Sequence, residues 1–230
     1  MTDYTLHYWP IPFRGHFIRY ALAQAGASWD EAVIDPTTAD YPFIAQPLLT
    51  DHTADRTTSQ TGGRQLSQCP AILMYLGRKH GLVAEPDETL RLICDAMDVL
   101  YEITRYHGAQ MWDRAAWDAF TGDRLPRWME IHERIAVANG VTPEAGFLFG
   151  TDAATLADLS LAALWHTMAD KLPGLRPLLN THAPAVEGLV DRVAGQEQIA
   201  DGQFLLALSD AINAADTLFH LAGVPGQVIV

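Results

Sequence analysis

In the first 80 residues, short apolar runs with strand character alternate with stretches of helical spacing. Residues 13–25 predict a helix, because Phe17, Ile18, Ala21 and Leu22 recur at helical steps and a glycine follows. A second helix opens with Pro70, whose missing N–H suits a first turn, and a basic turn precedes Gly81. The strands expected around these helices are residues 5–9, 32–35, 47–51 and 64–67.

Beyond a predicted linker at residues 85–88 the pattern is helical throughout. Apolar residues recur at three- and four-residue steps, and Cys94 is expected on the apolar face of the first helix, in the core. Thr155 and Asp158 predict a capping box that opens a helix buried all round. The expected helices are residues 90–114, 125–138, 155–172 and two shorter ones punctuated by Pro173, Pro177 and Pro184.

This pattern indicates two domains, an α/β domain over residues 1–83 and an all-helical domain over residues 88–230. The β-α-β, β-β-α order of the first is that of a thioredoxin-like fold. The polar tract between Asp51 and Arg64 predicts a long hairpin loop. The segment beyond Gln203 predicts an amphipathic helix that covers a pocket, packs on the outside of the helical domain or packs on a partner subunit.

Composition narrows the classes of function. The net charge of −13 argues against nucleic acid or an anionic membrane as the main partner. No apolar run has the length of a membrane span, and the N-terminus shows no secretory pattern, so a cytoplasmic protein is expected. The two cysteines, Cys69 and Cys94, form no metal-ligand pattern, and no metal is expected.

The clearest chemical signal lies where a strand ends at Gln68-Cys69 and a helix begins directly. Free backbone N–H groups at such a helix start favour an anion. The segment resembles the γ-glutamyl clamp of the cytosolic glutathione transferases, in which a Glu/Gln-Ser pair precedes Ala-Ile and Tyr-Leu, here Ala71-Ile72 and Tyr75-Leu76. The resemblance covers nearly the whole chain. It implies a glutathione-binding thioredoxin-like domain, a helical domain lining an electrophile pocket, and a homodimer.

A second segment resembles the Mu, Pi and Sigma classes of that family: Tyr8-Trp9-Pro10-Ile11, followed by Arg14 and Arg19. The resemblance implies that Tyr8 donates its O–H to the glutathione sulfur. A hydroxyl donor favours the thiolate of a thiol whose pKa is otherwise about 8.5. The alternative is that Tyr8 is a core aromatic of an edge strand. The loop at residues 10–13 holds no Ser or Cys, which argues against disulfide exchange.

The resemblance also assigns a glutathione site to Trp9, Arg14, Gln46, Pro47, Gln68 and Cys69. Pro47 is expected in cis, because Gln46-Pro47-Leu48-Leu49-Thr50-Asp51 follows the family pattern Val-Pro-x-Leu-x-Asp with Gln46 in the Val place. Cys69 departs from the usual Ser, and a thiol is a weaker donor. Two alternatives remain for Cys69: it weakens the binding of glutathione, or it has a redox role by forming a mixed disulfide with glutathione.

For the helical domain the resemblance implies an electrophile pocket and a dimer contact. The pocket residues are Ile11, Tyr106, Met111 and Trp112, the last three expected on the helix of residues 90–114. Core or dimer packing is the alternative for each. Glu102 is the acidic residue whose spacing fits a contact across the dimer to the glutathione amine, and a solvated charge is its alternative.

The expected activity is a glutathione transferase with glutathione as co-substrate, in which Tyr8 stabilises a thiolate that attacks an electrophilic small molecule. A glutathione-dependent isomerase, lyase or peroxidase on the same scaffold remains an alternative. So does a non-enzymatic binding protein.

Overall fold

The computed structural model describes residues 2–54, 63–172 and 174–200. These residues form two compact units, residues 2–82 with 197–200 and residues 83–196. The expected division between residues 83 and 88 lies close to this boundary, and the role assigned to each domain stays a prediction. The predicted loop at residues 51–64 and the helix beyond Gln203 lie largely or wholly outside the described residues.

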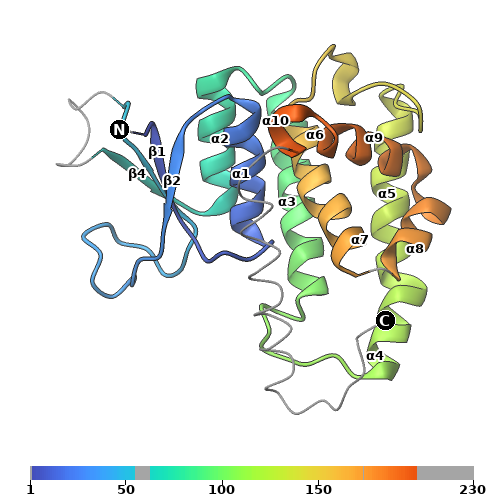
Figure 1. The fold of residues 1–230 in the computed structure, drawn as a ribbon. Helices are drawn as coiled ribbons and strands as arrows, with labels where there is room; N and C mark the ends of the chain where they lie inside the picture. Colours follow the sequence, from blue (N-terminus) through green and yellow to red (C-terminus); the bar gives the residue numbers. More distant parts are fainter. Residues whose placement is uncertain (1, 55–62, 173, 201–230) are drawn as a thin grey trace. The chain divides into compact units, whose positions relative to one another are not determined.

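The first unit is a four-stranded mixed sheet with the order β2-β1-β3-β4. Strand β1 runs parallel to β2 and antiparallel to β3, which is antiparallel to β4. The helices α1 and α2 lie on the same side of the sheet (Figure 1). The elements are β1 (Tyr4–His7), α1 (Arg14–Gln24), β2 (Trp29–Ala32), β3 (Leu48–Asp51), β4 (Arg64–Ser67), α2 (Cys69–His80) and α10 (Glu197–Ala200).

Apolar side chains from sheet and helices form the core of this unit. Leu6, Leu49, Ile72 and Leu76 are fully buried. Helix α2 begins with proline in its first turn and ends at Gly81, whose φ of 70° gives a left-handed cap. Both ends of this helix, and strand β4, confirm the sequence prediction. Strand β2 begins three residues earlier than predicted, because its pairing with β1 over Tyr4–His7 sets its register.

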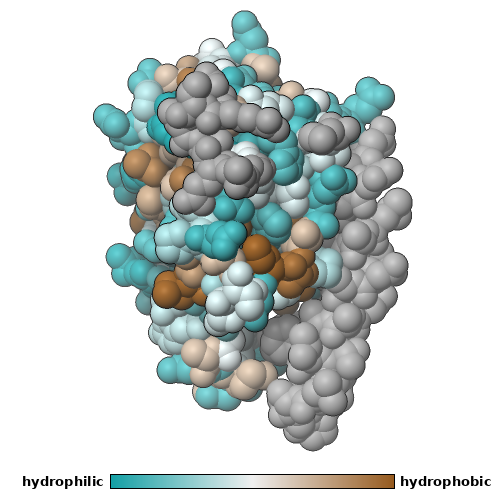
Figure 2. Space-filling view, turned by 90° about the vertical axis from the view of Figure 1, so that its left-hand side faces the viewer, coloured by the Kyte–Doolittle hydropathy of each residue, from teal (hydrophilic) through white to brown (hydrophobic). Residues whose placement is uncertain are grey.

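The face of the molecule seen in Figure 2 is largely hydrophilic where it is coloured, with hydrophobic side chains in small separate groups. Among the described residues of the first unit, the large apolar side chains that are exposed are Trp9, Val33 and Ile44.

The second unit is helical. Its α-helices are α3 (Pro86–Ile103), α4 (Arg114–Ala119), α5 (Leu125–Ala138), α6 (Leu156–Leu161), α7 (Thr167–Lys171), α8 (Leu175–His182) and α9 (Pro184–Ala194). Two π-helical segments, η1 (Phe120–Arg124) and η3 (Ala162–His166), join α4 to α5 and α6 to α7, and η2 (Leu148–Gly150) is a 3-10 turn. Helix α5 confirms the predicted range, and the run from α6 to α7 is buried almost throughout.

The predicted capping box is confirmed at the start of α6. The backbone N–H and the hydroxyl of Thr155 both donate to Asp158, at 2.8 and 2.7 Å. Asp158 also accepts from the N–H of Leu148 at 2.8 Å, which attaches the preceding loop to this helix.

Three predictions about the first helix of this unit were wrong. The helix begins at Pro86, inside the predicted linker, and ends at Ile103, not at residue 114. Beyond it the Thr104 hydroxyl bonds to the Leu100 carbonyl at 2.8 Å, and the chain turns left-handed. Tyr106, Met111 and Trp112 therefore lie in a loop. Cys94 is exposed, because the buried stripe of α3 passes through Leu92, Ile93, Ala96 and Met97 and leaves residue 94 outside it.

Candidate functional site

Three strand ends meet at one end of the sheet and form the candidate site. His7 of β1 pairs with Leu48 of β3, which pairs with Ser67 of β4. The residues that continue β1, precede β3 and follow β4 are thereby brought to the same end. The expected site residues in these segments are Tyr8, Gln46, Pro47, Gln68 and Cys69.

Tyr8 continues β1 into this site, and its N–H donates to the Ala32 carbonyl at 2.9 Å. Its side chain is buried and makes an edge contact with the Trp9 ring at 5.4 Å. Burial raises the pKa of the Tyr8 hydroxyl to about 12, and the neighbouring Cys69 adds to the rise. The charge of Arg14 and the N–H groups that open α1 oppose the rise in pKa. Tyr8 is therefore protonated at neutral pH and can act as a donor.

Arg19 holds the loop that follows Tyr8. It is 1% exposed, and its guanidinium binds both carboxylate oxygens of Glu31 at 2.6 Å. The same guanidinium donates to the carbonyls of Trp9 at 3.1 Å and Ile11 at 3.2 Å. Sequence reasoning noted Arg19 but assigned it no role. The available signal was an arginine within an apolar helical pattern, which requires a partner when buried.

Gln46 and Pro47 precede β3, and the peptide bond between them is cis, as predicted. The Gln46 side chain is buried, and its Nε2 donates to the Ile34 carbonyl at 2.9 Å. Its Oε1 is buried without a hydrogen-bond partner among the described residues. This segment holds a buried acceptor that a ligand amide could satisfy.

Gln68 and Cys69 form the junction between β4 and α2. Gln68 has φ 71° and ψ 115°, a left-handed conformation that is unfavourable for a residue with a side chain. It makes no side-chain cap, so the backbone N–H groups in the first turn of α2, where Pro70 has none of its own, are open to a ligand. The Cys69 thiol is buried and donates to the Arg14 carbonyl at 3.4 Å, which joins the starts of the two helices. Burial raises the pKa of this thiol to about 12.

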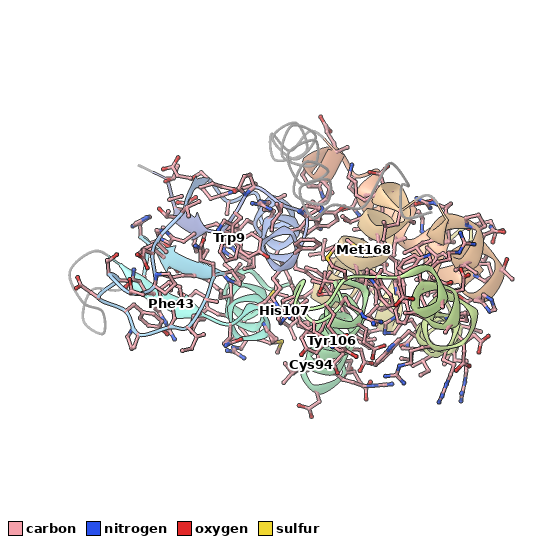
Figure 3. All side chains as sticks on the ribbon, turned by 90° about the horizontal axis from the view of Figure 1, so that it is seen from below. Trp9, Phe43, Cys94, Tyr106, His107 and Met168 are labelled. Carbon is pink, nitrogen blue, oxygen red and sulfur yellow. The ribbon has the colours of Figure 1, made fainter. Side chains whose placement is uncertain are left out.

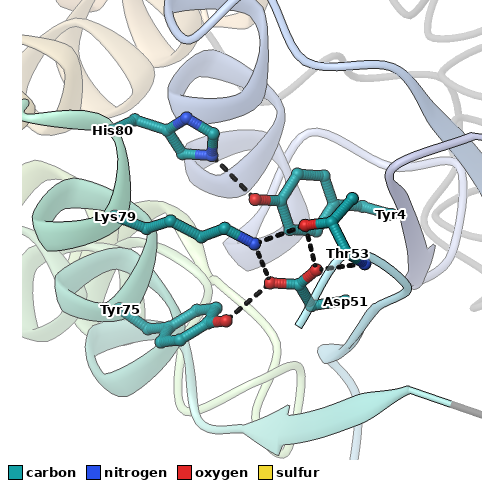
Figure 4. Close-up of polar contacts among 6 residues, drawn as sticks. All are labelled: Tyr4, Asp51, Thr53, Tyr75, Lys79 and His80. Atoms are coloured by element: carbon teal, nitrogen blue, oxygen red, sulfur yellow. Dashed lines mark hydrogen bonds and ion pairs between the residues drawn. The ribbon is translucent and has the colours of Figure 1, made fainter. Parts of the chain in front are cut away.

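A network of polar side chains attaches the other end of α2 to β3 (Figure 4). The buried Asp51 carboxylate accepts from the Tyr75 hydroxyl at 2.5 Å and pairs with Lys79. It also accepts from the N–H and hydroxyl of Thr53, both at 2.8 Å. These bonds hold the pKa of Asp51 below its usual value even though burial alone would raise it. Sequence reasoning placed Asp51 in the proline pattern but did not foresee this network.

Beside it, the Tyr4 hydroxyl and the His80 Nε2 are joined at 2.7 Å, which adds a contact between β1 and the end of α2. Helix α2 is thus attached to two strands by its C-terminal turn. The N-terminal turn of α2 lies at the candidate site.

The helical unit holds a separate pocket of about 390 Å³. Tyr106 and Trp112 line it, whereas Met111 is exposed and does not line it, and the assignment of these residues to an electrophile pocket stays a prediction. Figure 3 labels Tyr106 and the adjacent His107 on the segment after α3. Ile11 belongs to the other unit. Glu102 also lines the pocket, and its carboxylate binds Arg124 of the same chain at 2.7 and 3.0 Å.

No cluster of three or more potential metal-ligating side chains occurs within the part of the chain that the structure describes. The described helices include none with both the length and the apolar character needed to cross a membrane.

Comparisons with known proteins bear on the family and the fold of this chain. Residues 88–209, more than half of the chain, match the family described as glutathione S-transferase, C-terminal domain. The chain is 28% identical to glutathione S-transferase P 1 of Xenopus laevis over 153 residues, which cover 60% of this chain and 66% of that protein. The matched segment thus spans just under two thirds of this curated relative.

Two solved structures share the fold. The Pi-class glutathione S-transferase of Onchocerca volvulus superposes with a TM-score of 0.70 at 19% identity, over 93% of this chain and 95% of that one. Prostaglandin synthase D of Nilaparvata lugens superposes with a TM-score of 0.61 at 17% identity, over 86% and 96%. At these identities the two structures show the fold alone.

Proposed function

The chain belongs to the glutathione S-transferase family, and from that premise we propose that it is a glutathione transferase in which Tyr8 activates the glutathione thiol. The observation that supports this most directly is the sheet register, which brings Tyr8, Gln46-Pro47 and Gln68-Cys69 to one end of the sheet. A glutathione site needs a clamp for the γ-glutamyl carboxylate, a backbone partner for the cysteinyl amide and a hydroxyl donor for the sulfur.

The residues at this end fit the chemistry of glutathione. The free N–H groups at the start of α2 suit the γ-glutamyl carboxylate, beside Gln68 and Cys69. The backbone of Gln46, before cis Pro47, suits the cysteinyl amide. Arg14 and the half-exposed Trp9 complete the proposed site.

The role of Tyr8 follows from its protonation. A hydroxyl with a pKa of about 12 keeps its proton at pH 7 and can donate it in a hydrogen bond to sulfur. That bond favours the thiolate, so the thiol proton leaves to solvent at a pH below the usual thiol pKa. The thiolate then forms a bond to an electrophilic carbon, which expels a leaving group or takes up a proton.

Cys69 is not the nucleophile in this proposal. With a pKa of about 12, its thiolate fraction at pH 7 is on the order of 10⁻⁵. Its thiol is also already hydrogen-bonded to the Arg14 carbonyl. Cys69 takes the place of a serine hydroxyl, and we propose that it weakens the clamp without adding redox chemistry.

Further parts of the proposal rest on the family. Detoxification of a hydrophobic electrophile in the cytoplasm by a homodimer is the proposed setting. Ile11, Tyr106, Met111 and Trp112 would contact the electrophile, and Glu102 would contact the partner subunit. Glu102 is paired with Arg124 of its own chain, so a contact of Glu102 with the partner subunit requires this ion pair to break.

The test is an ultraviolet titration of glutathione into the protein across pH, with Tyr8→Phe measured in parallel. We expect a thiolate band at a pH below the usual thiol pKa in the wild type, and a shift of that band to higher pH in Tyr8→Phe. Absence of binding in the wild type would overturn the proposal. A band that ignores the substitution would exclude Tyr8 as the activating residue.

A glutathione-dependent isomerase, lyase or peroxidase is the second candidate, because the same thiolate serves these reactions. A fold shared with a prostaglandin synthase is compatible with it. A screen that finds isomerisation, elimination or peroxide reduction but no conjugation would favour it. A protein that binds glutathione but turns over no substrate would favour the non-enzymatic alternative.

A further inference from the structure

Helix α5 ends at the pair Asn139-Gly140. Of the three asparagines in the chain, at positions 139, 180 and 213, this is the one that precedes glycine. The backbone nitrogen of the residue after an asparagine can attack the side-chain amide carbon, and glycine has no Cβ to hinder the approach. Gly140 is exposed and has φ 78°, a conformation that favours glycine at the end of a helix. Asn139 is therefore the asparagine of this chain whose sequence context is most open to such an attack.

The Asn139 side chain connects the end of α5 to the turn η2. Its Nδ2 donates to the Ile135 carbonyl at 2.9 Å, and its Oδ1 accepts from the Phe149 N–H at 3.3 Å. The neighbouring Leu148 N–H donates to Asp158, so the same turn is also bonded to the capping box of α6. A neutral amide can donate and accept at once, whereas a carboxylate can only accept. The connection between α5 and η2 therefore depends on the amide of residue 139.

The folded geometry opposes attack on this amide. Asn139 has ψ 9°, which turns the Gly140 nitrogen toward the backbone nitrogen of Asn139 and away from its side chain. The Gly140 N–H also donates to the Val137 carbonyl at 2.9 Å. Attack requires both arrangements to be lost, together with the two side-chain bonds. The end of a helix opens locally at a free energy below that of global unfolding, and such an opening of α5 permits the reaction.

We propose that Asn139 is a site of spontaneous deamidation, which proceeds through local opening of the last turn of α5 and detaches η2 from this helix. The Gly140 nitrogen loses its proton and forms a bond to Cγ of Asn139, and the side-chain amide leaves as ammonia. Water then opens the cyclic imide to aspartate or isoaspartate, with no oxidant or reductant. Asn139 lines an open groove of the helical unit, through which water reaches it. The proposal does not rest on the glutathione site.

The product fits its surroundings less well than asparagine does. An aspartate at residue 139 has no hydrogen for the Ile135 carbonyl, so two oxygens face each other where asparagine forms a hydrogen bond. Its negative charge also lies at the C-terminus of α5, the negative end of the helix dipole. Isoaspartate adds a carbon to the backbone between helix and loop. Each change should weaken the connection between α5 and η2 and lower the stability of the helical unit.

The test is to incubate the full chain at pH 8 and to map the products by peptide mass spectrometry. We expect acid to accumulate at residue 139, with isoaspartate among the products. Asn180 is an internal control: it precedes Thr181, its amide donates to Glu187 at 2.7 Å, and it should keep its amide. In denaturing urea the reaction at residue 139 should be faster by at least about tenfold, because the last turn of α5 no longer has to open.

Two variants test the consequence for stability. Asn139→Asp carries the product from the start, and its midpoint of urea unfolding should lie below that of fresh wild type. The midpoint of incubated wild type should move toward this value as the converted fraction grows. Asn139→Gln is the matched control for incubation, since its longer side chain would have to close a less favourable six-membered ring. It should show neither conversion nor a shift with time.

The outcomes separate this proposal from the proposed function. Absence of acid at residue 139 in the folded protein, after weeks in which the urea-unfolded chain converts fully, would overturn it. So would equal rates in the folded and unfolded chains, or an unchanged midpoint in Asn139→Asp. None of these results bears on the thiolate band of bound glutathione, and loss of that band leaves the result at residue 139 standing.

Discussion

The Tyr8 ring leaves no room for a side chain at Gly15. A Cβ placed there would lie 2.2 Å from Cδ1 and 2.5 Å from Cγ of Tyr8, closer than real carbon contacts allow. Since these are ring atoms of a buried side chain, the ring could only move as a whole. Gly15, in the first turn of α1, thus sets the position of the hydroxyl proposed to activate glutathione.

Gly15→Ala should therefore displace the Tyr8 ring and its hydroxyl. We expect kcat with a standard electrophile to fall by about tenfold to a hundredfold, because a shift of about 1 Å at a reacting group has effects of that size. The thiolate band of bound glutathione should move to higher pH. Steady-state kinetics and the ultraviolet titration measure the two effects.

The control for this substitution is Gly122→Ala, at a glycine in a helical segment with open space around its Cα. It should leave kcat and the thiolate band unchanged. Wild-type values for both measurements in Gly15→Ala would show that Tyr8 is not positioned by this contact.

Cys69→Ser should improve glutathione binding. A hydroxyl is a stronger donor than a thiol, so a serine side chain that exchanges the Arg14 carbonyl for the glutathione carboxylate would make the stronger bond to it. We expect KM for glutathione to fall by about fivefold to tenfold, the effect of one improved hydrogen bond to a charged group. Cys94→Ser, at the exposed second cysteine, should leave KM unchanged. A rise in KM in Cys69→Ser would contradict the proposed clamp.

Asp51→Asn should destabilise the first unit. The substitution removes the charge that Lys79 pairs with and disturbs the bonds from Tyr75 and Thr53, at a side chain that is 1% exposed. Breaking a buried pair of this kind costs about 3 kcal/mol. Urea unfolding at pH 7 measures the loss. Asp118→Asn, in an exposed pair, should change the free energy of unfolding by less than about 0.5 kcal/mol.

The pH dependence of this network has a definite sign. The Asp51 pKa is lowered in the folded protein, so its stabilisation is present above the unfolded value of 3.8 and is lost as the pH falls through the folded value. Asp51→Asn should therefore lose less stability than the wild type on acidification in this range. Parallel loss in both proteins would contradict the assignment.

His132 should make the protein sensitive to mild acid. It is fully buried and accepts from the Trp165 indole through Nδ1 at 2.9 Å, which requires the neutral ring. Burial, with a smaller contribution from Arg91, lowers its pKa to about 4. Since the unfolded chain takes up this proton near pH 6.5 and the folded chain near 4, stability falls between these values, by up to about 3 kcal/mol.

Urea unfolding at pH 7 and pH 5 checks this effect. His132→Gln should show less loss of stability between the two pH values than the wild type. His182→Gln, whose imidazole pairs with Glu130 at the surface, should retain the wild-type loss. Equal losses in all three proteins would rule out His132 as the group responsible.

Local signals allowed much of the fold to be predicted from the sequence. Helix α5 follows its apolar period, and α2 follows both its apolar period and its end signals, Pro70 and Gly81. Thr155 with Asp158 forms the capping box that their spacing indicates. The cis bond before Pro47 followed from the family pattern. In each case the information lies within a few residues along the chain.

The sequence predictions failed where a residue's structure or role depends on a partner that is distant in the sequence. Apolar residues continue past Ile103 at helical spacing, yet the turn at Arg105 to Gly108 reverses the hand of the backbone, and composition carries no mark of it. Arg19 reaches Glu31, twelve residues away. Asp51 meets Lys79, twenty-eight residues away. Pairs this distant become visible only once the strands and helices are folded.

The left-handed turn has a consequence for how this chain can evolve. Three side chains, those of Arg105, Tyr106 and His107, stand where glycine would relieve the backbone. Replacement of His107 by glycine would remove a steric conflict and make the fold easier to maintain. Replacement of Arg105 or Tyr106 would do the same while dismantling the wall of the pocket. If lineages drift toward greater thermal robustness, glycine should therefore enter this turn first at residue 107, and last at the two residues that line the pocket.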